Sequence, residues 1–70
     1  MDSNAIKGQA ISAISAHNTR QRNSLDMIDI HPTNMKVIDE NTVVLDSPRE
    51  RVLVSRPFSG LFQVVGRQLK

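Results

Sequence analysis

The sequence predicts a mostly β domain of the α+β class, with an N-terminal helix or arm followed by a small four- to five-stranded antiparallel meander or barrel. Two observations lead to this fold. Apolar residues recur at helical spacing near the start of the chain, and short runs rich in Val, Ile and Leu follow from residue 25 onward, divided by turn residues. With 70 residues the chain has room for one small core. We expect a helix and polar linker over residues 1–24 and a β unit over residues 25–70.

The first segment is predicted to be a helix. Asp2, Ser3 and Asn4 offer side-chain oxygens for its N-terminal cap. Apolar positions then recur along one stripe, which consists of Ile6, Ala10, Ala13, Ile14 and His17. A second track holds small residues at four-residue steps, namely Gly8, Ser12 and Ala16. Such a track would let another backbone approach closely, although small residues are also usual on a plain exposed helix face.

Residues 18–24 are polar throughout and are expected to form a linker or a frayed helix end. Because this segment has no apolar anchor, the helix is expected to stand off the β unit as an arm. An arm of this kind reaches a neighbouring subunit.

Short strands are predicted after the linker, over residues 25–30, 35–38, 42–46, 51–56 and 61–65. Pro32 ends the first of them, because proline lacks the N–H that a strand ladder uses. A hairpin turn is predicted around residues 39–41, where Asn41 is able to take the left-handed conformation, and Ser47 and Pro48 are expected to begin the next turn. Gly66 is expected to end the last strand, before a basic tail.

The last strands are apolar on both faces, since Val52, Leu53 and Val54 are consecutive. Strands of this kind are normally covered on both sides, and one short helix covers only one of them. A partner would cover the other side, or the sheet would curl into a barrel whose interior takes one strand face. The predicted protein-interface residues are Ile6, Ile11, Ile14, Val52, Val54, Phe58, Phe62 and Val64.

Charge is segregated along the chain. Residues 25–46 hold five acids and one lysine, whereas residues 47–70 hold five cations and one acid. If the fold keeps these blocks apart, copies would dock head to tail, with the acidic face on the basic face. The alternative is that neighbouring strands pair acid with base inside one subunit.

The sequence offers no chemistry for catalysis. No nucleophile has a base beside it, and the only histidines, His17 and His31, show no metal-ligand spacing. Cysteine is absent, which excludes disulfides and thiolate metal sites. We therefore expect neither an enzyme nor a bound metal or cofactor.

Nucleic-acid binding is the main alternative to a protein-contact role. Arginine and lysine side chains of the C-terminal third would follow a phosphate backbone, while a phenylalanine stacks on a base. These candidate contacts, to nucleic acid or to an acidic protein surface, are Arg49, Arg51, Arg56, Arg67 and Lys70. The acids of residues 25–46 argue against this alternative.

The build resembles the small accessory proteins of large assemblies, particularly minor capsid, connector or tail components of bacteriophages. The resemblance implies a structural virion component that binds copies of itself or neighbouring subunits. A small regulator that binds one protein partner shares the same features. No run approaches the roughly 18 apolar residues of a membrane span, and Asp2 stands where a signal peptide has basic residues. We therefore expect a cytoplasmic protein, or a virion assembled in the cytoplasm.

Overall fold

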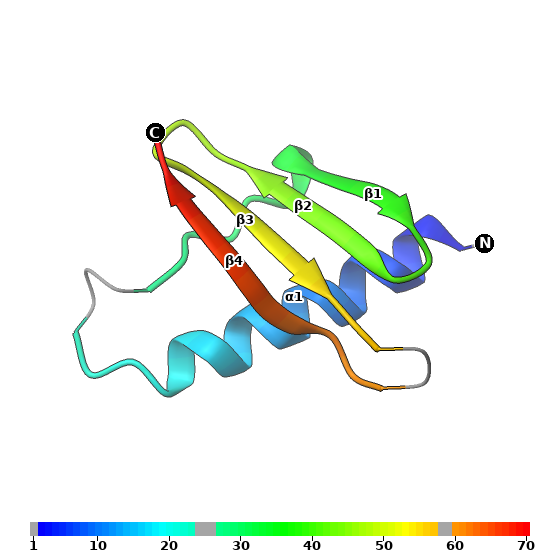
Figure 1. The fold of residues 1–70 in the computed structure, drawn as a ribbon, viewed down its shortest axis with the longest axis horizontal. Helices are drawn as coiled ribbons and strands as arrows, with labels where there is room; N and C mark the ends of the chain where they lie inside the picture. Colours follow the sequence, from blue (N-terminus) through cyan, green and yellow to red (C-terminus); the bar gives the residue numbers. More distant parts are fainter. Residues whose placement is uncertain (1, 24–26, 58–59) are drawn as a thin grey trace.

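The computed structural model describes residues 2–23, 27–57 and 60–70. Its elements are α1 (Ser3–Thr19), a 3₁₀ turn (Pro32–Asn34), β1 (Met35–Asp39), β2 (Thr42–Asp46), β3 (Glu50–Ser55) and β4 (Gln63–Leu69). The four strands form one antiparallel sheet in the order β1-β2-β3-β4, and α1 crosses one of its faces (Figure 1). The predicted α+β fold, a helix followed by a small antiparallel meander, is confirmed.

The helix forms where the capping residue and the apolar stripe place it. Asp2 accepts hydrogen bonds at its Oδ1 from the backbone N–H groups of Asn4 and Ala5, at 3.1 and 3.2 Å. The buried helix residues Ile6, Ala10 and Ile14 lie on the predicted stripe. Because α1 contacts all four strands, the segment expected to form a separate arm shares one core with the β unit.

The core is a single apolar layer between α1 and the sheet. Its buried residues are Ile6, Ala10, Ile14, Ile28, Met35, Val43, Leu45, Val52, Val54 and Phe62. Burial alternates along the central strands, so that Val52 and Val54 face the helix while Leu53 faces outward. The consecutive apolar residues of this strand therefore serve both faces of the sheet.

The last strand differs from its prediction. It begins at Gln63 rather than at residue 61 and continues through Gly66 to Leu69. A β-bulge at Val65 shifts the register against β3, and Arg67 then lies opposite Val52. Pairing with a complete neighbouring strand carries β4 past the glycine, so the residues expected to form a basic tail belong to the sheet.

The predicted strand over residues 25–30 is wrong for the part that the structure describes, because residues 27–30 have no strand pairing; residues 25 and 26 lie outside the described part. A side chain holds this segment instead. Asn18 donates from its Nδ2 to the Ile28 carbonyl at 2.8 Å and accepts from the Ile28 N–H at 2.7 Å. The linker thus contains a polar anchor, and Ile28 enters the core.

The two turns fit the predictions unequally. The Ser47 turn is confirmed: the backbone N–H of Ser47 donates to the Glu50 carbonyl at 3.0 Å, and its hydroxyl donates to the same oxygen at 2.9 Å. The hairpin of β1 and β2 is present, but its turn does not use the left-handed conformation available to Asn41, because no non-glycine residue in the described ranges has a positive φ. Asp39 closes that turn by accepting from the Asn41 N–H at 2.8 Å, and a register shift at Ile38 accommodates it.

Candidate protein-interaction surfaces

The sheet face opposite α1, called the outer face below, carries apolar side chains that no described residue covers. Val44 lies directly opposite Leu53 in the ladder and is half-buried. Three further apolar residues are solvent-exposed: Leu53 is 38% exposed, Ile38 53% and Val65 57%. Ile38 and Val65 both sit at register shifts, one in each edge strand. These four residues cross the sheet from β1 to β4.

Charged side chains border the outer face near the β2–β3 turn. Asp46 accepts a hydrogen bond from the Lys70 ammonium and lies 3.6 Å from an Arg51 guanidinium nitrogen. The hydrogen bond from Lys70, with the positive charges of Lys70 and Arg51, holds the pKa of Asp46 below its ordinary value. Acid and base from neighbouring strands therefore pair within one subunit at this border.

The lowered pKa predicts a pH effect with a definite sign. The ionised Asp46 is favoured in the folded state, so its contribution to stability is present above the ordinary carboxyl pKa and is lost as pH falls through the folded value. Carbon-13 NMR of the side-chain carboxyl should show Asp46 titrating at lower pH than an unpaired aspartate. In Lys70→Ala the titration should move up toward the ordinary value; an unchanged titration would contradict the pairing.

A second ion pair lies on the helix side of the sheet. Arg67 donates from Nε and from Nη2 to the two carboxylate oxygens of Glu50, at 2.7 and 3.1 Å. The Glu50 side chain is only 10% exposed and that of Arg67 is 29% exposed. Two parallel hydrogen bonds of this kind fix both side chains.

Arg56 connects three parts of the fold. Its Nε donates to the Asn41 side-chain oxygen at 3.2 Å, and its Nη1 donates to Gln9 in α1 at 3.1 Å. Its guanidinium carbon also lies 5.0 Å from the centroid of the Phe62 ring. The cations predicted for nucleic acid are thus largely engaged within the chain: Arg51, Arg67 and Lys70 pair with acids, and Arg56 bridges the hairpin, the helix and Phe62.

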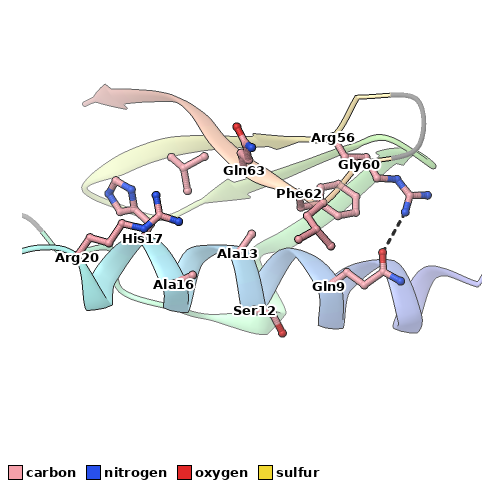
Figure 2. Close-up of a pocket in the computed structure, with 12 residues that line it drawn as sticks. Gln9, Ser12, Ala13, Ala16, His17, Arg20, Arg56, Gly60, Phe62 and Gln63 are labelled. Atoms are coloured by element: carbon pink, nitrogen blue, oxygen red, sulfur yellow. Dashed lines mark hydrogen bonds between the residues drawn. The ribbon is translucent and has the colours of Figure 1, made fainter.

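A groove of about 670 Å³ lies between α1 and the segment that leads into β4. Figure 2 shows His17 and Arg20 at one end of it and Gln9 with Arg56 at the other. Between these ends α1 presents small side chains, those of Ser12, Ala13 and Ala16. Leu61, Phe62 and Val64 supply apolar surface on the strand side, where Leu61 is 85% exposed.

The predicted interface residues lie mostly inside the subunit. Five are buried in the core: Ile6, Ile14, Val52, Val54 and Phe62. Ile11 and Val64 are half-buried against that core, and Phe58 lies outside the described residues. A partner that leaves the fold intact meets other side chains, such as Leu53, Val65 and Leu61, which sequence reasoning missed. Strict alternation along residues 52–54 would have separated Leu53 from the two buried valines.

Two absences hold for the described ranges. They contain no group of three His, Cys, Asp or Glu side chains placed to hold a metal ion. None of their helices is both long enough and apolar enough to cross a membrane. Comparison with known proteins finds no matching family model, no matching curated protein and no matching solved structure.

Proposed function

We propose that this chain is a non-enzymatic assembly protein that binds a second copy of itself through the outer face. One observation carries the proposal: α1 covers a single face of the sheet, and the other face keeps Val44, Leu53 and Val65 together with no described residue over them. Apolar side chains in such a group stabilise association when they leave water.

The composition of the outer face suits a protein contact. Its apolar centre is surrounded by polar and charged residues, among them Lys36, Thr42, Asp46, Arg51 and Gln68, which resembles the core and rim of known interfaces. A face of four short strands lies at the lower end of the areas that hold stable dimers. We therefore expect association that depends on concentration, strengthened where many copies are held in one assembly.

The finer proposal is that this assembly is a virus particle, with the chain as a minor capsid, connector or tail component. Its support is the analogy of build: a very small domain with a marginal core that gains stability from neighbours. Nucleic-acid binding receives less support, because Arg51, Arg67 and Lys70 are paired with carboxylates of the same subunit, which lowers the positive potential available to phosphates.

The test is the molar mass of the purified chain by size-exclusion chromatography with light scattering, over a range of concentrations in low and high salt. We expect the mass to rise toward twice 7.8 kDa at both salts. Val65→Lys should weaken the dimer about tenfold or more, because it puts a charge into the apolar centre. Its fold should survive, since Val65 is 57% exposed.

Ser15→Lys is the control, because it adds the same charge at an exposed position of α1, on the side of the sheet away from the outer face. A control that dimerises like the wild type, beside a weakened Val65→Lys, supports the outer face. Dimers that dissociate only in high salt would indicate ion pairs instead. A monomer at every concentration would contradict self-association and leave the single-partner regulator as the better function.

A further inference from the structure

The groove beside α1 is a second surface, on the opposite side of the sheet from the outer face. We propose that it binds an extended, acidic segment of a partner protein, which adds as a strand to the free edge of β4 and rests on α1. The inference rests on the proposed function only in that the chain works through protein contacts. It concerns different residues from those of the outer face, so an experiment can contradict one proposal without contradicting the other.

The free edge of β4 is the first step. Among the residues that the structure describes, β4 pairs with β3 alone, which leaves backbone groups on its other side available to an added strand. Leu61, two residues before β4, is 85% exposed, and Leu69 at the end of the strand is 79% exposed. The edge at β1 is less suited, because it is shorter and carries the charged residues Lys36 and Asp39.

The helix α1 supplies a surface on which the added strand packs. In Figure 1 the C-terminal half of α1 continues beyond β4, on the side away from β3. The small side chains of Ser12, Ala13 and Ala16 line the groove there, so an added backbone approaches closely, with Val64 beside it. The partner segment would be the fifth strand of the sheet, and α1 already lies beneath its position. The groove therefore suits a single extended segment better than a partner sheet that brings its own covering helix.

Charge decides the chemistry of the segment. Among the described residues, the charged groups that line the groove are Arg20 and Arg56, with His17 beside Arg20, and no carboxylate lines it. Arg20 is exposed and forms no ion pair within the described residues. Two copies of this groove would repel each other, whereas carboxylates near the ends of an apolar segment would meet a cation at each end.

The experiment is an NMR titration of the ¹⁵N-labelled full chain with three blocked nonapeptides. Each alternates valine and threonine and carries glutamate, glutamine or lysine near both ends. We expect the glutamate peptide to shift the amides of Ala13, Ala16, Gln63 and Val64 and to bind about five- to tenfold more tightly than the glutamine peptide at low salt. A glutamate peptide with N-methylated alternate residues should bind poorly, because it lacks the donors of a strand.

Charge reversal separates binding from damage to the fold. Arg20→Glu should lose the glutamate preference and bind the three peptides with similar affinity, because one end of the groove is then acidic while Arg56 keeps the other end basic; an unfolded chain would bind none of them. Arg22→Glu, an exposed change two residues away and outside the groove lining, should keep the wild-type preference. The proposal would be overturned if the wild-type chain bound the three peptides equally, or if the peptides shifted amides of the outer face alone. It would also be overturned if Arg20→Glu and Arg22→Glu had equal effects on the peptide preference. A dimer whose interface is the groove would overturn it as well.

Discussion

Val54→Asp is expected to leave the chain unfolded at 25 °C. Val54 is fully buried, and its partners in the two neighbouring strands are apolar, Val43 in β2 and Val64 in β4. Burial of an unpaired carboxylate costs several kcal/mol, about the whole stability of a domain this small. The measurement is the far-UV circular dichroism spectrum with a ¹H–¹⁵N correlation spectrum, which should lose its dispersion.

Val65→Asp is the matched control, because the same charge enters the same sheet at a residue that is 57% exposed. It should keep the folded spectrum. A folded Val54→Asp variant would show that Val54 does not lie in the core. The comparison also separates two explanations for any loss of association on changing Val54: unfolding of the subunit, and removal of a contact surface.

Arg67→Met is expected to destabilise the chain by about 2–3 kcal/mol, the range for losing hydrogen bonds to a charged group that is largely buried, and by more than Glu50→Leu does. The reason is the unequal burial of the pair: removing Arg67 leaves a carboxylate that is 10% exposed, whereas removing Glu50 leaves a guanidinium that is 29% exposed and reaches water. The measurement is urea unfolding followed by circular dichroism.

The double variant, Arg67→Met with Glu50→Leu, completes the cycle. Because it leaves neither charge without its partner, its loss of stability should be smaller than that of Arg67→Met alone. Additive losses would mean that the two side chains do not stabilise each other. In that case the hydrogen bonds at 2.7 and 3.1 Å would add nothing to the stability of the fold.

Local signals predicted most of the fold. The cap at Asp2, the helical stripe and the Ser47 turn are set by residues close in sequence, and the structure places them as predicted. The errors involve distant residues. Gly66 is a plausible strand end by itself, but pairing with β3 carries the strand past it. Asn18 holds Ile28, ten positions away, which no periodicity reveals.

The candidate surfaces were harder to predict than the fold. Core residues and interface residues are both apolar. Three consecutive apolar residues at positions 52–54 therefore did not show that Val54 belongs to the core and Leu53 to the outer face. The cations of the C-terminal third were counted as free, whereas Arg67 finds Glu50 seventeen positions away. The groove is formed by α1 and residues 60–64, which only the packed helix brings together.

The strand order has a consequence for how the chain reaches its fold. Each strand pairs with the next one in sequence, so the sheet is built from hairpins whose loops are short and close quickly. The contacts of α1 with β4 join the two ends of the chain and form at a much larger entropic cost. Docking of the helix is therefore the step that makes folding cooperative, since the hairpins alone have no buried face.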